Sequence, residues 1–189
     1  DKEVLAANSR GLIALSGCIA GEVASKVLQG QPDQARQAAG IYREIFGPDN
    51  FFLEIQDHGF EEQRIANREL VKIHREMGIP LVATNDVHYV QREDAAIQDV
   101  LLAIQTGKSV DDPGRMKFQS EELYLKSPRE MNLLFGELPE AINNTVEIAE
   151  RCNVELEFGK YFLPHYAVPE GYNADTYLAN MRAKGFAAS

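Results

Sequence analysis

Pro80-Leu81-Val82-Ala83-Thr84-Asn85-Asp86-Val87-His88 joins a short apolar run to a polar sequence that follows it directly. A continuous apolar run of this length is typical of a strand with both faces covered. Two similar runs precede it, at residues 12–15 and 51–55, and polar residues follow each of them. The sequence therefore predicts three buried strands, the third over residues 80–84.

The segments between these runs have the spacing of apolar residues that is typical of helices. We expect one helix between Cys18 and Leu28, a second over residues 32–46 and a third over residues 61–77. Parallel strands need crossovers of this length, whereas antiparallel strands need only a tight turn. The order strand–helix–helix–strand–helix–strand thus predicts an α/β fold with a parallel sheet or barrel.

The second half of the chain predicts mainly helices. We expect them over residues 94–106, from Ser127 to residue 135, over residues 139–152 and from residue 174. Ser127 and Glu130 have the spacing of a capping box, and Asn173 is the expected N-cap of the last helix. Residues 123–125 are a candidate short strand, and residues 153–169 are expected to be extended.

Composition excludes several classes of protein. The chain has 189 residues, 44% of them hydrophobic and 25% charged, which is the balance of a globular domain. Its formal charge of −10 argues against a surface devoted to nucleic acid. Two cysteines make no disulfide framework and favour a reducing, cytoplasmic setting, and no apolar run is long enough for a membrane. The first residue is Asp1 rather than methionine, so we expect a fragment of a larger protein.

Polar side chains follow all three predicted strands. In parallel α/β folds, functional groups gather beyond the carboxyl ends of the strands. These are the residues that we expect at that common rim: Ser16, Gly17 and Cys18 after the first strand, Gln56, Asp57 and His58 after the second, and Asn85, Asp86 and His88 after the third.

Asp86 and His88 are the most informative pair. In an extended segment, residues two apart point the same way, so their side chains would converge. A carboxylate and an imidazole could then share a divalent ion such as zinc or manganese, or the carboxylate could orient the ring of the histidine. The alternative is a plain loop in which Asp86 caps the next segment and His88 lies at the surface.

Cys18 and His58 are weaker candidates from the residues alone. A thiolate is a soft metal ligand, but a cysteine at the end of a strand is more often a small buried hydrophobe. His58, between Asp57 and Gly59, is either a rim residue that contacts a substrate or a turn residue. No phosphate-binding glycine loop, nucleophile elbow or Cys-x-x-Cys pair occurs in the sequence.

Six long runs, in this order, resemble the C-family of bacterial replicative DNA polymerases, the polymerase III alpha subunits. They are GLIALSGC at 11–18, FLEIQDHG at 52–59, LVATNDVHY at 81–89, DVLLAIQTG at 99–107, PEAINNT at 139–145 and IAERCN at 148–153. The resemblance runs nearly end to end. It implies that residues 1–160 are the later part of a polymerase-and-histidinol-phosphatase (PHP) domain and that residues 161–189 begin the polymerase palm.

This resemblance implies a distorted seven-stranded β/α barrel with a metal cluster at its carboxyl rim. Asp86 and His88 match the family's final Asp-x-His ligand pair, and Cys18 falls where the family places a ligand. His58 matches a residue of the motif without an assigned place among the ligands. The family's other ligands precede Asp1, and its polymerase aspartates follow Ser189, so this chain is expected to hold no catalytic residue of its own.

The implied function is that of a fragment of a DNA-directed DNA polymerase. The PHP site would take Zn, Mn or Mg and support 3′–5′ exonuclease activity, and the polymerase site would take Mg. The implied partners are a DNA primer–template, dNTPs, a proofreading exonuclease subunit and other replicase subunits, without a membrane. Two alternatives stay open: an inactive PHP scaffold that docks the proofreading subunit, and a free-standing PHP phosphoesterase.

Overall fold

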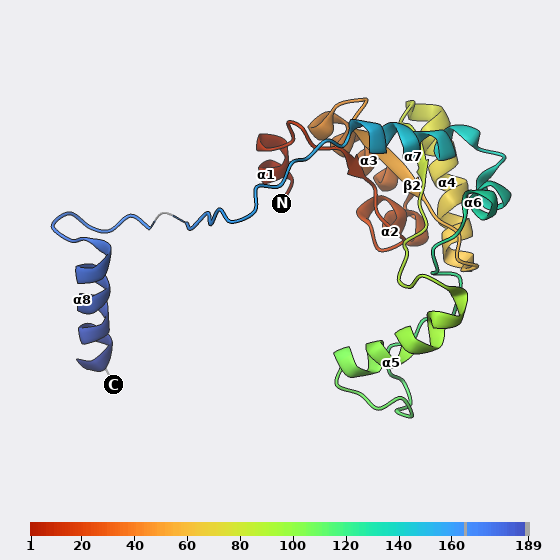
Figure 1. Ribbon diagram of the computed structural model, residues 1–189. Helices are drawn as coiled ribbons and strands as arrows, with labels where there is room; N and C mark the ends of the chain where they lie inside the picture. Colours follow the sequence, from red (N-terminus) through yellow and green to blue (C-terminus); the bar gives the residue numbers. More distant parts are fainter. Residues whose placement is uncertain (165, 188–189) are drawn as a thin grey trace. The chain divides into compact units, whose positions relative to one another are not determined.

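The computed structural model describes residues 1–164 and 166–187 (Figure 1). The chain divides into two units, Asp1–Cys152 and Asn153–Ser189. The first unit holds the sheet and seven of the α-helices that the structure describes, and the second holds the last helix. None of the described helices is both long enough and apolar enough to cross a lipid bilayer.

The first unit is built on a parallel sheet of three strands in the order β1-β2-β3. The strands are β1 (Ala14–Leu15), β2 (Phe51–Ile55) and β3 (Leu81–Ala83). Ala14 pairs with Phe51, and Leu53 pairs with Leu81. This arrangement confirms the predicted α/β fold with a parallel sheet, although β1 and β3 are two residues shorter than expected.

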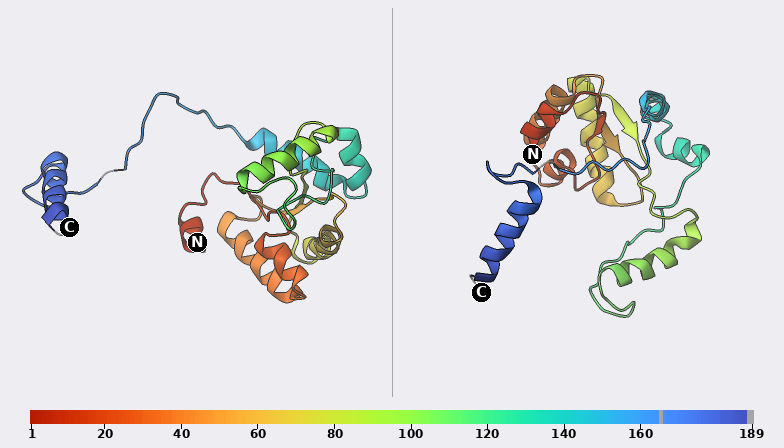
Figure 2. Two further views of the ribbon diagram at one scale, coloured as in Figure 1. Left: turned by 90° about the horizontal axis from the view of Figure 1, so that it is seen from below. Right: turned by 60° about the vertical axis from the view of Figure 1, so that its left-hand side comes forward.

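Six of the seven α-helices of the first unit lie near their expected places, and Figure 2 shows this unit in two further views. A 3₁₀ turn, η1 (Arg92–Asp94), precedes the fifth of them. The first helix was not predicted, and the second begins four residues after Cys18. In order, they are α1 (Lys2–Ala7), α2 (Glu22–Leu28), α3 (Pro32–Phe46), α4 (Glu61–Met77), α5 (Ala95–Gln105), α6 (Pro128–Phe135) and α7 (Pro139–Arg151).

Glycines explain where two of these helices stop or start. Gly78 ends α4 in the left-handed conformation, with φ of 66°, which a residue without a Cβ adopts at little cost. Gly21 precedes α2 where a Cβ would lie 2.3 Å from the carbonyl oxygen of Ser16. The chain therefore turns tightly between β1 and α2, and only glycine fits at this position.

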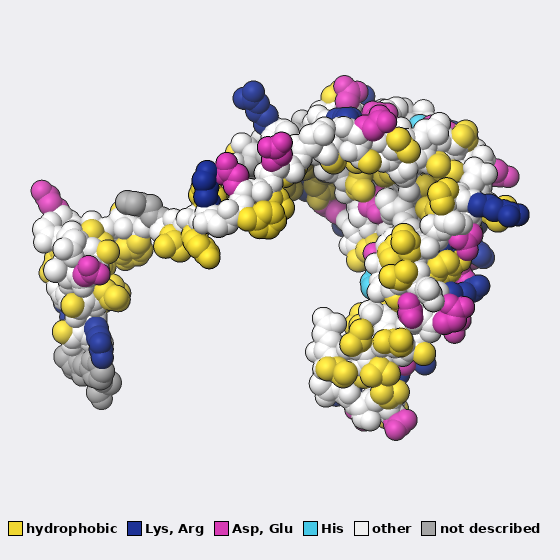
Figure 3. Space-filling view, viewed as in Figure 1, with side chains coloured by type: hydrophobic (Ala, Val, Ile, Leu, Met, Phe, Trp, Pro, Cys, Tyr) yellow, Lys and Arg dark blue, Asp and Glu magenta, His cyan; other side chains and the backbone are white. Residues whose placement is uncertain are grey.

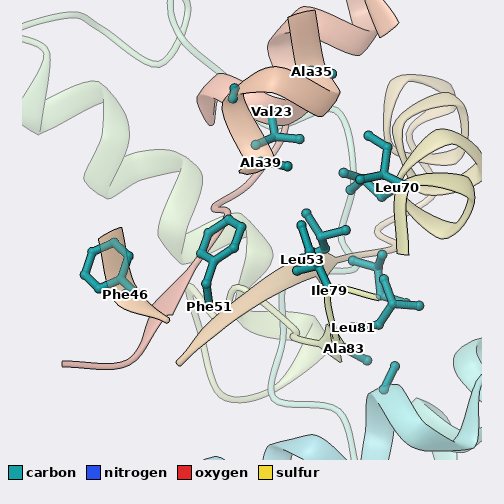
Figure 4. Packing of buried hydrophobic residues seen from close by; sticks show 14 of the residues in the cluster. Val23, Ala35, Ala39, Phe46, Phe51, Leu53, Leu70, Ile79, Leu81 and Ala83 are labelled. Atoms are coloured by element: carbon teal, nitrogen blue, oxygen red, sulfur yellow. The ribbon is translucent and has the colours of Figure 1, made fainter. Parts of the chain in front are cut away.

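The core lies between the sheet and the helices that cross over it (Figure 4). Leu53 and Leu81 on neighbouring strands are fully buried, as is Ile73 on α4. Ala35 and Ala39 on α3 join the same cluster. Four of the five residues of β2 are buried, which is the pattern of a central strand covered on both faces.

Helix α7 packs along β3, and one polar contact fixes it there. Asn144 donates from Nδ2 to the carbonyl of Leu81 at 2.6 Å. The carbonyl of the preceding residue, Pro80, accepts from the N–H of Leu53 on β2. Because carbonyls alternate in direction along a strand, the Leu81 carbonyl faces away from β2, and Asn144 satisfies it.

Residues 84–126 connect β3 to α6 and add no strand to the three-stranded sheet. The predicted strand at 123–125 is reduced to one parallel bridge between Tyr89 and Tyr124. The predicted helix at 94–106 is confirmed as η1 and α5. Hydrophobic side chains gather over α5, where Ile97 is 60% and Ile104 is 70% exposed (Figure 3).

The second unit is an extended segment followed by α8 (Ala174–Ala187). The predicted N-cap is confirmed, because the Asn173 side chain accepts from the N–H of Thr176 at 2.8 Å. The first unit ends at Cys152, within the stretch predicted as PHP domain. The boundary at residue 160 and the palm beyond it stay predictions.

Candidate functional site

The carboxyl ends of the three strands meet at one rim, as parallel pairing requires. Glu54 is the polar centre of this rim. Its carboxylate accepts from the N–H of Gly17 at 3.1 Å, from the Gln56 amide at 3.1 Å and from the hydroxyl of Thr84. Its own N–H donates to Ser16 Oγ at 2.9 Å. One glutamate thus joins the ends of β1, β2 and β3.

Gln56 lies beside this glutamate and is buried, with 6% of its surface exposed. Its Nε2 donates to Glu54 and to Thr84 Oγ1, both at 3.1 Å. Its Oε1 is the one buried side-chain oxygen or nitrogen without a hydrogen-bond partner in the described part of the chain. An acceptor left open in this way is a place for a donor that the protein itself does not supply, such as a water.

The backbone conformation at Asp86 differs from the one that the sequence predicts. Residues 86–88 were expected to be extended, but Asp86 has φ of 44°, in the left-handed region. Among the described residues other than glycine, it is the one with positive φ. Aspartate tolerates this conformation better than most residues, but it persists only where the surroundings hold it.

His88 nevertheless lies against Asp86. Its Nδ1 is 2.7 Å from the carbonyl of Asp86 and 4.0 Å from the Asp86 carboxylate. Because a carbonyl can only accept, Nδ1 carries the proton and the lone pair of Nε2 is left for another partner. A hydrogen bond of this kind fixes the ring of a metal-binding histidine. The ring also packs edge-on against Phe118, with centroids 4.9 Å apart.

His58 is 1% exposed, and both of its ring nitrogens are engaged. Nε2 lies 2.7 Å from the carbonyl of Asn85, so it donates, and Nδ1 accepts from the Gln63 amide at 2.8 Å. Burial lowers the pKa of the ring below its usual value, against the opposing effect of the bond to Asn85. This neutral, fully bonded ring has no lone pair left for a metal, and the structure places His58 beneath the rim rather than on it.

Cys18 is exposed on the loop after β1 and has no disulfide. Together with Gly17, it lines a narrow crevice that Glu54 and Gln56 border. In the described ranges, no three His, Cys, Asp or Glu side chains come close enough to hold a metal ion. The structure thus brings Asp86 and His88 together but does not join Cys18 to them in one ligand set.

The donor types of Asp86 and His88 fit a divalent ion, with a part-exposed carboxylate and an oriented imidazole. Two donors are fewer than a stable protein site supplies. The described residues therefore fit part of a metal site, and further ligands would have to come from the remainder of a longer protein.

Sequence reasoning missed Glu54 and Thr84, and placed Gln56 at the rim without a role. One signal for Glu54 was present: it is the single charged residue in the otherwise apolar run at 51–55. A charge in a strand with two covered faces needs polar partners nearby. Nothing in the sequence itself showed that Thr84, thirty residues later, would be one of them.

Comparison with known proteins supports the resemblance found in the sequence. The profile of the PHP domain family matches residues 1–58. The chain is 44% identical over 186 residues to the DNA polymerase III subunit alpha of Treponema pallidum, and 42% identical over 187 residues to that of Borreliella burgdorferi. Each match covers 98% of this chain and 16% of the relative. This chain is homologous to one segment of the DNA polymerase III alpha subunit.

The homology extends well past the stretch that the PHP profile matches. The alpha subunit of Deinococcus radiodurans is 46% identical over 179 residues, which is 90% of the chain and 13% of the relative. The parallel sheet with crossover helices agrees with part of a β/α barrel. The chain spans about a sixth of the length of the relatives from Treponema and Borreliella.

Proposed function

We propose that the protein to which this chain belongs is a DNA-directed DNA polymerase of bacterial replication. It would act in the cytoplasm, extend a primer on a DNA template with dNTPs and use Mg in its polymerase site. This chain would contribute the later part of the PHP barrel, residues 1–160, and the start of the palm, residues 161–189. The observation that carries the proposal is identity of 40% or more along nearly the whole chain to DNA polymerase III alpha subunits.

The PHP part would bind divalent metal through Asp86 and His88, with further ligands from residues outside this chain. A bound ion of this kind lowers the pKa of a water and neutralises charge on a phosphate, as a 3′–5′ exonuclease requires. Within this chain, Asp86 presents a carboxylate and His88 presents Nε2, while the Asp86 carbonyl holds the proton of Nδ1. The ion would be Zn, Mn or Mg.

The second candidate is a scaffold that docks a proofreading exonuclease subunit and other replicase subunits. One observation favours it: apolar side chains are exposed along α5, where Ile97 is 60% and Ile104 is 70% exposed, and such side chains are typical of a surface that another protein covers. A free-standing PHP phosphoesterase is less well supported, because the identity to polymerase subunits continues far beyond residue 58.

Metal content and nuclease activity of the full-length protein test the two candidates. The variant Asp86→Asn with His88→Ala removes both donors, and Asp111→Asn is the matched control on an exposed loop. For a working site, we expect the double variant to lose bound metal and to release no nucleotides from a primer 3′ end, while the control keeps both. A folded wild-type protein with neither bound metal nor nuclease activity would exclude the metal-dependent exonuclease, and the scaffold would be the remaining candidate function.

A further inference from the structure

Asn85 lies directly before the left-handed Asp86 and is held from three directions. Its carbonyl accepts from His58 Nε2 at 2.7 Å. Its Oδ1 accepts from Lys126 Nζ at 3.3 Å, and its Nδ2 donates to the carbonyl of Tyr124. These partners come from the loop after β2 and from residues 122–126, so Asn85 joins two segments that are far apart in sequence.

Lys126 is an unusual partner, because only 3% of its side chain is exposed. Its ammonium group donates to the carbonyl of Glu122, lies 3.6 Å from the Glu122 carboxylate and sits 4.6 Å from the centre of the Tyr124 ring. Burial lowers its pKa, and Glu122 opposes that effect. A buried lysine is unfavourable unless every donor is used, so this one is held in place by a defined set of acceptors.

His58 is equally constrained on the other side of Asn85. Its backbone N–H donates to Gln63 Oε1 at 2.8 Å, and Gln63 Nε2 donates back to the ring at Nδ1. The two bonds fix both the orientation of the ring and the nitrogen that carries the proton. His58 therefore offers Asn85 one donor in one position.

The segment is also fixed downstream of Asp86. The N–H of His88 donates to the carbonyl of Leu123 at 2.9 Å, and the N–H of Leu125 donates to the carbonyl of Tyr89 at 3.1 Å. Asp86 is thus the strained link between two anchored residues, Asn85 and His88. A non-glycine residue keeps a left-handed conformation only when its surroundings determine it in this way.

We propose that Lys126 and His58 are positioning residues for the Asp86–His88 pair, acting through Asn85. They hold the Asn85 carbonyl and amide so that Asp86 turns left-handed and brings its carboxylate to His88. Neither side chain touches the proposed ion. The effect on metal binding rests on the proposed function, whereas the effect on the conformation of residues 85–89 does not.

The test compares Lys126→Met with Lys72→Met in the full-length protein. Methionine keeps most of the length and the apolar stem of lysine but donates no hydrogen bond. Lys72 is an exposed lysine of α4 that pairs with Glu69, so it controls for the loss of a charge. Two quantities are measured: amide hydrogen exchange of peptides covering residues 84–90 and 33–46, and the Zn²⁺ dissociation constant by competition with a chelator.

In Lys126→Met, we expect faster exchange over residues 84–90, unchanged exchange over 33–46 and Zn²⁺ binding about 10–100-fold weaker, as is typical when the support of a metal ligand is removed. Lys72→Met should match the wild type in both measurements. Unchanged exchange over 84–90 together with unchanged Zn²⁺ affinity in Lys126→Met would overturn the inference. If Lys126→Met does not fold, Asn85→Ala is measured in its place, because it removes both the acceptor for Lys126 and the donor to Tyr124 without adding a charge beside Asp86.

The double variant of Asp86 and His88 separates this inference from the proposed function. If its Zn²⁺ binding equals that of the wild type, the proposed metal site is wrong, and exchange over residues 84–90 alone decides the positioning role. If the double variant loses Zn²⁺ but Lys126→Met keeps both the wild-type Zn²⁺ affinity and the wild-type exchange over residues 84–90, the metal site stands and the positioning role fails.

Discussion

Strand β2 and residues 154–163 are both rich in apolar side chains but bury them to opposite extents. In β2, Leu53 is fully buried and Phe51 is 1% exposed. In the second segment, Phe158 is 91%, Phe162 is 88% and Leu163 is 85% exposed. Apolar composition therefore does not decide burial in this chain. What differs is the surrounding structure, since β2 has a strand on each side and helices over it.

The difference has an energetic meaning. Burying a leucine or phenylalanine contributes about 1.5–3 kcal/mol relative to leaving it in water. In the first unit, this gain supports the fold, whereas the exposed side chains of 154–163 contribute little to the stability of the second unit. Variants in the two regions should therefore respond very differently to the same chemical change.

The largest expected effect comes from truncating the core of the sheet. Leu53→Ala should lower the free energy of unfolding of the chain by about 2–5 kcal/mol, because it leaves a cavity among fully buried neighbours. Phe162→Ala should change it by less than about 0.5 kcal/mol, although it removes more atoms. Urea unfolding followed by circular dichroism measures both. Equal losses would contradict the distinction between the two regions.

A smaller effect on stability is expected when the N-cap side chains of two helices are removed. Ser127 accepts from the N–H of Glu130 at the start of α6, which packs through Phe135 on the core. Ser127→Ala should lower the free energy of unfolding by about 1 kcal/mol. Asn173 caps α8 in the second unit, so Asn173→Ala should reduce helical content without shifting the unfolding of the first unit. A shared shift in the urea midpoint would show that the units unfold together.

The smallest expected effect is a change in how the stability of the first unit depends on pH in acid. Hydrogen bonds from Ser127 and then Tyr124 lower the pKa of Glu130 from 4.5 to about 2. A carboxyl with a lowered folded pKa adds stability above its unfolded pKa and loses it as pH falls toward the folded one. The stability difference between wild type and Glu130→Gln should therefore be full above pH 4.5 and shrink between pH 4.5 and 2. Thermal melts across this range measure it, and a constant difference would contradict the assignment.

The sheet and its crossover helices could be predicted because local signals agreed with the global fold. The strand at 51–55 and the helix at 61–77 have the bounds that the sequence predicts. For the helix, Gly78 supplies a stop signal, and the periodic placement of Leu70 and Ile73 supplies the buried face. Each of these signals lies within the element that it describes.

The site could be predicted only in part, because its geometry depends on distant residues. Sequence reasoning paired Asp86 with His88, and they do lie together, but through a left-handed turn rather than an extended strand. That turn depends on Lys126, which lies forty residues later, and on the burial of His58. Spacing along the chain carries no information on contacts of this kind.

The contact between Asn144 and Leu81 has a consequence for association between molecules. A strand at the border of a sheet presents backbone groups to which another chain can add a strand, and such additions lead to aggregation. The amide of Asn144 donates to the outward carbonyl of Leu81, so that carbonyl is not free to pair with a strand of another chain. Helix α7 thus occupies the outer edge of β3, where a strand of another chain would otherwise add, as well as covering the core.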